Sequence, residues 1–123
     1  MKIYKHRLFT RWAKTQDICN YQLKNIVKDL QDEIFEGNLG GGLYKKRLAS
    51  TKSKKGKRSG YRYIIAFKKN DRAFFIYGYA KNKLANISNI EKSIYKKLAK
   101  YLLNADQKVI DKMIEDKSLI EVN

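Results

Sequence analysis

The sequence predicts an α+β fold, in which helices near both termini pack against a small, mainly antiparallel sheet. Apolar residues recur every three or four positions in the first third of the chain, alternate in the middle third, and return to helical spacing in the last third. Consecutive strands joined by short turns pair antiparallel, and the flanking helices cover the sheet. With 123 residues and 43% hydrophobic content, the chain is expected to form one domain, residues 1–123.

The first elements are predicted to be a short strand and a helical turn. Residues 2–8 alternate weakly, with Ile3 and the aliphatic stem of Lys5 facing inward, which favours a strand. Thr10 to Lys14 are expected to form a helical turn with Phe9 and Trp12 on its inner side.

A long helix is predicted over 16–36. Its apolar residues recur every three or four positions, which is the spacing of one helix face, and Gly37 is expected to stop it. These apolar residues are Ile18, Leu23, Ile26, Val27, Leu30, Ile34 and Phe35.

The middle of the chain is predicted to supply the main strands. Three glycines, Gly40 to Gly42, are expected to form a flexible hinge before a strand over 43–48. Residues 61–68 alternate and are rich in strand-forming types, and 73–79 are apolar on both faces, as in a central strand. Because only 69–71 separate these two segments, they are expected to form a hairpin.

The C-terminal part is predicted to form two helices and an edge strand. Ser88 followed by Glu91 has the form of a capping box, and Asn104 with Gln107 repeats the signal. The apolar residues expected on the inner face of the first helix are Ile87, Ile90, Ile94, Leu98 and Leu102. The last six residues are expected to add an edge strand.

The charge of the chain points to a polyanionic partner. The formal net charge is +16, and between Leu43 and Arg72 twelve Lys or Arg side chains accompany a single acid, Asp71. Four rings lie among these cations and are interpreted as stacking platforms for unpaired RNA bases: Tyr44, Tyr61, Tyr63 and Phe67. The alternative is a solvated basic loop with no ligand.

Other features restrict the class of protein. A single cysteine, Cys19, excludes an internal disulfide, and no stretch resembles a signal peptide or a membrane span, so a cytoplasmic location is expected. There is neither a cluster of His, Cys and carboxylates at metal-ligand spacing nor a phosphate-binding glycine loop that opens a helix. We therefore expect no metal and no cofactor.

Several ordered motifs resemble one family, the HigB-type branch of the RelE/ParE toxins. The motifs are Leu39 to Leu48 (LGGGLYKKRL), Gly56 to Arg62 (GKRSGYR) and Phe75 to Asn82 (FIYGYAKN), together with Phe9, Arg11, Trp12 and the cap at Asn86 to Ser88. The resemblance implies a microbial RNase-like RelE fold and a type II toxin that cleaves mRNA in the ribosomal A site. It also implies a helix-turn-helix (HigA-like) antitoxin that, in complex with the toxin, binds operator DNA.

The candidate catalytic residues are cationic. RNA cleavage through the 2′-hydroxyl needs proton transfer and stabilisation of a crowded phosphorane, and the only histidine, His6, is expected to have a structural or surface role. Arg62 is the first candidate, because alternation puts it on the strand face opposite Tyr61 and its guanidinium can grip a phosphate bidentately. Lys81 follows the neighbouring strand and is a candidate base, acid or charge stabiliser.

Further candidate catalytic and RNA-binding residues accompany Arg62 and Lys81. Lys46 and Arg47 point to opposite sheet faces by alternation, and Arg47 is favoured for the face of Arg62 because it matches the family motif, while Lys46 would reach around an edge. Lys57 is a fourth candidate catalytic residue, on a loop that closes over the messenger or contacts ribosomal RNA. The residues expected to bind RNA are Lys45, Lys46, Lys54, Lys55, Arg58, Tyr61 and Tyr79, although core packing is the favoured role for Tyr79.

Two other functions remain open from the sequence. The ParE side of the superfamily poisons DNA gyrase, and a basic protein of this size can also bind RNA or the ribosome without catalysis.

Overall fold

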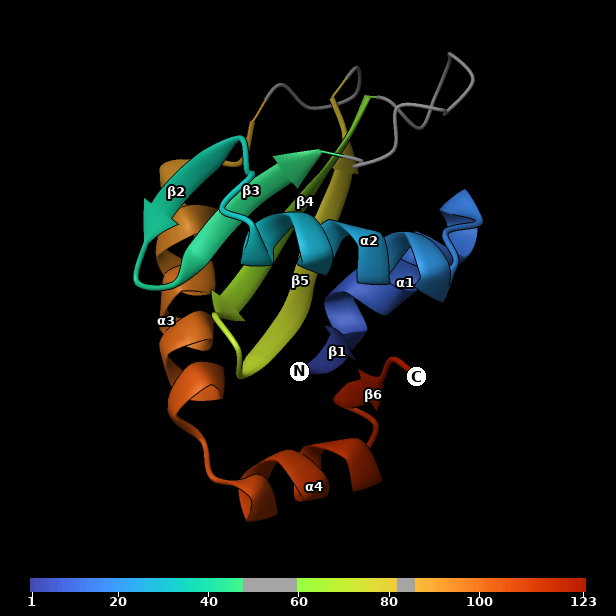
Figure 1. The fold of residues 1–123 in the computed structure, drawn as a ribbon, viewed down its shortest axis with the longest axis vertical. Helices are drawn as coiled ribbons and strands as arrows, with labels where there is room; N and C mark the ends of the chain where they lie inside the picture. The colour runs from blue at the N-terminus through green and yellow to red at the C-terminus, as the bar shows by residue number, and fades with distance from the viewer. Residues whose placement is uncertain (48–59, 82–85) are drawn as a thin grey trace.

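In the part of the chain that the structure describes, six strands form one sheet, and four helices pack on it (Figure 1). The computed structural model describes residues 1–47, 60–81 and 86–123. The elements in chain order are β1 (Lys2–His6), α1 (Arg7–Gln16), α2 (Asn20–Gln31), β2 (Gly37–Gly40), β3 (Leu43–Arg47), β4 (Tyr61–Lys68), β5 (Arg72–Ala80), α3 (Asn89–Asn104), α4 (Gln107–Glu115) and β6 (Leu119–Glu121). The predicted α+β class is therefore confirmed.

The strand order is β2-β3-β4-β5-β1-β6. Neighbouring strands are antiparallel except β1 and β5, which are parallel, and β6 pairs antiparallel with β1. The predicted hairpin of β4 and β5 and the predicted edge strand near the C-terminus are both confirmed. The first strand lies inside the sheet, so both of its faces are covered: Ile3 packs on one side, and Tyr4, which is 2% exposed, is buried on the other.

The sheet separates two apolar layers. Figure 1 shows α1 and α2 over one face, while α3 runs along the other and α4 lies next to β6. Alternate residues of β4 divide between the layers as a two-residue period requires. Tyr61, Tyr63, Ile65 and Phe67 pack with α1 and α2, and Ile64 and Ala66 pack with α3.

A bulge in β5 breaks the alternation. Ile64 pairs with Tyr77 while Ile65 pairs with Phe75, so Ile76 is one extra residue between these pairs. Without it, Tyr77 would share the face of Phe75 beneath α1. With it, Tyr77 and Tyr79 both lie on the α3 face of the sheet.

The predicted helix over 16–36 was too long at both ends. The helix α2 begins at Asn20, ends at Gln31, and has Asp32 as its C-terminal cap, after which Glu33 adopts a positive φ of 62°. Residues 34–36 lead into β2, a strand that the sequence analysis missed, so Gly37 begins a strand and does not stop a helix.

The glycine run is a turn and not a hinge. Gly40, Gly41 and Gly42 have φ values of 95°, 64° and 83°, and they connect β2 to β3, which pair antiparallel. Positive φ is accessible to glycine without a steric cost, which explains the run. A Cβ at Gly42 would also lie 2.5 Å from the Cδ1 atom of Leu103 on α3.

The helix caps were partly predicted. Ser88 and Glu91 form the expected capping box of α3. The N-cap of α4 is Asp106, whose side chain accepts from the Val109 N–H, and not Asn104. The predicted inner face of α3 was wrong in part: Tyr95, Ala99 and Leu102 are buried, whereas Ile90 and Ile94 are exposed.

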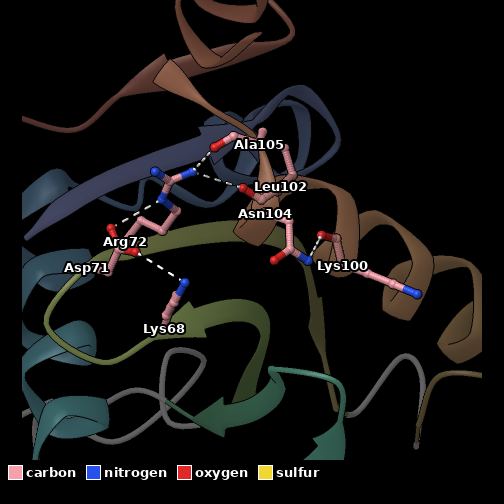
Figure 2. Close-up of polar contacts among 7 residues, drawn as sticks. All are labelled: Lys68, Asp71, Arg72, Lys100, Leu102, Asn104 and Ala105. Atoms are coloured by element: carbon pink, nitrogen blue, oxygen red, sulfur yellow. Dashed lines mark hydrogen bonds and ion pairs between the residues drawn. The ribbon is translucent and has the colours of Figure 1, made fainter. Parts of the chain in front are cut away.

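Arg72 joins the start of β5 to the end of α3 (Figure 2). Its Nη1 donates to the carbonyl oxygens of Leu102 at 3.2 Å and Ala105 at 2.7 Å, and its Nε lies 3.3 Å from Asp71. The last carbonyls of a helix lack intrahelical donors and carry partial negative charge, so a guanidinium there stabilises the helix end.

Replacing Arg72 with methionine is expected to lower the free energy of unfolding by about 2 kcal/mol, because the variant no longer makes two charge-assisted hydrogen bonds to a partly buried helix end. Chemical denaturation measures this. Asp71→Asn, which removes only the ion pairs of a half-exposed carboxylate, is the control and should cost less than about 1 kcal/mol. Equal losses for the two variants would contradict the capping role.

Candidate active site at one end of the sheet

Three of the predicted cations lie at the same end of neighbouring strands. Arg47 is directly opposite Arg62 in the β3–β4 register, and Arg62 is opposite Tyr79 in the β4–β5 register. Lys81 follows β5 at this end, where its backbone N–H donates to the Gly60 carbonyl oxygen at 2.8 Å. We call Arg47, Arg62, Tyr79, Lys81 and Glu36 the Arg62 site.

The guanidinium of Arg62 is buried and oriented by two contacts. Its side chain is 8% exposed, its Nε lies 2.8 Å from the Glu36 Oε1 atom, and its Nη1 donates to the Tyr61 carbonyl oxygen at 3.2 Å. A buried charge requires such a partner. These contacts engage Nε and one N–H of Nη1, so three N–H groups of the guanidinium, one on Nη1 and two on Nη2, have no partner among the described residues and are suited to a phosphate.

Glu36 was missed by the sequence analysis. It comes immediately before β2, and its backbone N–H donates to the Lys45 carbonyl oxygen at 2.8 Å, which holds it next to β3. No spacing rule connects residue 36 to residue 62, and the strand that positions Glu36 was itself unpredicted.

Tyr79 presents an unpaired hydroxyl to this site. The side chain is 4% exposed, and its Oη has no hydrogen-bond partner among the residues that the structure describes. Burial raises the pKa of the Tyr79 phenol, with contributions from Glu36 and Tyr77 that outweigh the opposing effect of Arg62. The phenol is therefore protonated at neutral pH and is a hydrogen-bond donor.

Two further tyrosines extend this side of the sheet. Tyr77 stacks on Tyr95 of α3 with ring centroids 5.3 Å apart, and lies 6.1 Å from the ring of Tyr79. Burial, Glu91 and Tyr77 raise the pKa of Tyr95 to about 12. All three phenols thus favour the neutral form in the folded protein.

The raised pKa of Tyr95 predicts a loss of stability in alkali. The phenol ionises near pH 10 in the unfolded chain and about 12 in the folded one, so its contribution is full below pH 10 and is lost as the pH rises toward 12. The free energy of unfolding should fall by about 2 kcal/mol more in the wild type than in Tyr95→Phe over this range. Denaturation at several pH values measures the difference, and parallel curves would contradict the assignment.

The other candidates divide by sheet face. Lys45 shares the face of Arg62, opposite Ile64. Lys46 does not reach around an edge as expected: it faces α2, is 5% exposed, and forms an ion pair with Asp29 at 3.2 Å. Its buried ion pair gives Lys46 a structural role, and we leave it out of the proposed RNA surface.

The interpretation of the strand aromatics as stacking platforms was wrong for Tyr61, Tyr63 and Phe67. Each is at most 7% exposed and packs beneath α1 and α2. Tyr61 also donates from its hydroxyl to Gln16 Oε1 at 2.6 Å and meets the Trp12 ring edge-on. Tyr44 is only partly buried, against Phe35 and Phe67, so its role as a stacking platform stays a prediction, whereas the three buried rings stabilise the core.

The predicted structural role of His6 is confirmed. Its Nδ1 accepts from the Leu8 N–H at 3.2 Å as the N-cap of α1, and burial together with Arg7 lowers its pKa. Four other candidates, Lys54, Lys55, Lys57 and Arg58, lie outside the described residues.

Neither a metal centre nor a membrane-spanning helix is found in the described ranges. Within residues 1–47, 60–81 and 86–123, no group of three or more His, Cys, Asp or Glu side chains is placed to hold a metal ion. No helix in the same part of the chain combines the length and the apolar content that crossing a membrane demands.

A mainly antiparallel sheet with helices on both faces and a cationic site at one end is the architecture of the small microbial RNase-like toxins. The family model described as the RelE toxin of the RelE / RelB toxin-antitoxin system matches residues 1–122. The chain therefore belongs to the RelE toxin family and is a toxin of a toxin-antitoxin system, whose partner is a cognate antitoxin. A search of curated proteins found no match.

Proposed function

We propose that this toxin is a ribosome-dependent, metal-independent endoribonuclease that cleaves mRNA in the ribosomal A site and thereby inhibits translation in the cytoplasm. The observation that carries the proposal is the Arg62 site, where a buried, oriented guanidinium lies beside a neutral phenol and two further cations. This is a set of groups suited to stabilising a dianionic phosphorane without imidazole.

Each residue of the site has a separate task in this proposal. The 2′-oxygen bonds to phosphorus as the bond from phosphorus to the 5′-oxygen breaks, so one proton leaves the 2′-hydroxyl and one reaches the 5′-oxygen. Arg62 binds the non-bridging oxygens through its unused N–H groups, and Arg47 adds positive charge on the same face. Tyr79 donates a hydrogen bond from its protonated phenol, and Lys81 transfers a proton or stabilises charge.

Glu36 is a positioning residue in this scheme. Its carboxylate holds Arg62 Nε at 2.8 Å, and this fixes the plane of the guanidinium. A fixed plane matters because small displacements of a phosphate-binding group have large effects on rate.

The cations outside the described residues extend the same surface in the proposal. The segment carrying Lys54, Lys55, Lys57 and Arg58 connects Arg47 to Gly60, and both of these residues lie at the Arg62 site. We assign Lys57 to the catalytic group, and Lys54, Lys55 and Arg58, with Lys45, to binding of the RNA backbone.

A purified translation system tests the proposal. Primer extension on a defined messenger should show toxin-dependent cuts at codon boundaries when ribosomes are present and little cleavage of the same RNA alone. Chelation of free metal in the assay without ribosomes should not lower that residual cleavage. An uncut messenger together with inhibited DNA supercoiling would replace this function by gyrase poisoning, and an uncut messenger with ribosome binding alone would indicate a non-catalytic protein.

Replacing Tyr79 with phenylalanine is expected to lower cleavage about 10- to 100-fold, because only the donating hydroxyl is removed. Stability should be unchanged or up to about 1 kcal/mol higher, since that buried hydroxyl has no partner among the described residues. Single-turnover cleavage and thermal denaturation measure the two effects. Tyr77→Phe is the control and should cleave like the wild type; full activity in Tyr79→Phe would remove Tyr79 from the chemistry.

We further propose that the antitoxin is a helix-turn-helix protein of the HigA type and that the toxin-antitoxin complex binds operator DNA. The support is the resemblance of the sequence motifs to the HigB-type branch. The test is whether a small helix-turn-helix protein encoded beside the toxin restores growth and whether the pair shifts a DNA fragment from its own promoter.

A further inference from the structure

An open groove rich in lysine lies away from the Arg62 site. Its volume is about 810 Å³, and it is bounded by α3, by the turn between β2 and β3, and by the end of β4. Five of the residues that line it are Lys68, Lys92, Lys96, Lys97 and Lys100. Lys68 is six positions after Arg62 along β4, which corresponds to about 20 Å along an extended strand, so the two sites are distinct.

The positive charge of this groove is not neutralised. Its lining contains no Asp or Glu, and among the five lysines only Lys68 forms an ion pair with a described acidic residue, Asp71 at 3.7 Å. In the described part of the chain, no ion pair joins the four lysines of α3 to an acid. Like charges three and four residues apart destabilise a helix, so this row costs stability unless an anion binds to it.

The lysines form a regular row. Lys92, Lys96 and Lys100 are spaced four residues apart on one side of α3, and the distance from the first to the last is about 12 Å at the rise of an α-helix. Lys96 closes the groove over the glycine turn, since a Cβ at Gly40 would lie 3.1 Å from its Nζ atom. Figure 2 shows one end of this arrangement, where Lys68 points toward Asp71 and Lys100 extends away from the Arg72 contacts.

We propose that this lysine groove binds the phosphodiester backbone of double-helical RNA without reading its sequence. Along a DNA duplex the phosphates of one strand advance about 3.4 Å each, and at a spacing of this order a row of about 12 Å spans several consecutive phosphates of one strand. The regular spacing suits a ligand whose charge repeats regularly better than an acidic protein segment. The only ring in the lining, Phe67, is 7% exposed, so the groove lacks the stacking platform that single strands use.

Equilibrium binding to an RNA hairpin, without ribosomes, tests this proposal. The variant Lys92→Gln/Lys96→Gln/Lys100→Gln removes three charges from the groove. The control Lys108→Gln/Lys112→Gln/Lys117→Gln removes three exposed lysines from α4 and the residues after it. Fluorescence anisotropy is followed over a range of KCl concentrations, and circular dichroism verifies that both variants are folded.

The groove variant should bind the hairpin about a hundredfold more weakly than the wild type near physiological salt. The slope of log K against log [KCl] should also become shallower by about 2.7, because each of the three phosphates that is no longer neutralised contributes about 0.9. The control should bind the hairpin at most about tenfold more weakly than the wild type. Equal losses of hairpin affinity in both variants would overturn the proposal, because the net charge of the protein would then explain the binding.

Two other outcomes would also overturn it. If the groove variant binds the hairpin normally but loses binding to a poly-glutamate peptide, the groove takes an acidic protein segment. If it keeps the hairpin and loses only single-stranded RNA, the duplex assignment is wrong. None of these measurements depends on mRNA cleavage, so a negative cleavage assay and a negative binding assay remain distinguishable.

Discussion

Replacing Arg62 with glutamine is expected to reduce ribosome-dependent cleavage by about 10²- to 10³-fold, which is the cost of removing one preorganised donor from a developing oxyanion. Among the described residues of the site, Arg62 is the cation that is both buried and held in place, by Glu36 and by the Tyr61 carbonyl oxygen. Single-turnover primer extension with excess ribosomes measures the chemical step.

Stability effects of this substitution can be separated from chemistry. Glu36 is one-third exposed, so it regains water when the guanidinium is removed, and the melting temperature should change little. The matched variant Glu36→Gln removes the charge of the same ion pair but leaves Arg62 in place, and its loss of cleavage should be about tenfold or less. Equal defects in the two variants, accompanied by equal losses of stability, would show that Arg62 has only a structural role.

Replacing Gly78 with alanine is expected to lower the free energy of unfolding by about 3 kcal/mol or to prevent folding. A Cβ there would overlap Cζ3 and Cε3 of Trp12 and lie 2.9 Å from its Cη2 atom. Trp12 has little room to move, because its ring contacts Phe9, Tyr61 and Tyr63. Chemical denaturation of the purified variant measures the loss.

A second substitution tests the cause. If the clash with Trp12 is responsible, the double variant Gly78→Ala/Trp12→Leu should be more stable than the sum of the two single effects predicts, by about 1 to 3 kcal/mol of coupling. Additive effects would contradict the steric account. Ala73→Gly, elsewhere on β5, is a control for the intrinsic effect of exchanging glycine and alanine in a strand.

The sequence was most informative where local rules determine structure. The hairpin of β4 and β5 follows from alternation and a three-residue turn, and the Ser88 and Glu91 cap follows from spacing. Alternation also predicted that Lys46 and Arg47 lie on opposite faces, the family motif favoured Arg47 for the face of Arg62, and the register confirms both. These features depend on residues that are close in the chain or paired through one turn.

Features that depend on contacts between residues far apart in the chain could not be predicted from the sequence. The bulge at Ile76 moves Tyr79 to the face of Arg62, and strict alternation from Phe75 would have placed it beneath α1. Glu36 reaches Arg62 only because β2 folds back on β3. The apolar residues Ile90 and Ile94 have the right spacing for burial, yet α3 turns Tyr95 and Ala99 toward the sheet, so periodicity alone did not identify its inner face.

The interior position of β1 has a consequence for how the toxin is made. This strand precedes the other described elements in the chain, but its two neighbours, β5 and β6, are about seventy and well over a hundred positions further along. Contacts so distant in sequence form slowly and late. A nascent chain therefore cannot complete the sheet around β1 before β6 has been synthesised, so a chain interrupted ahead of β6 leaves one edge of β1 without its partner strand.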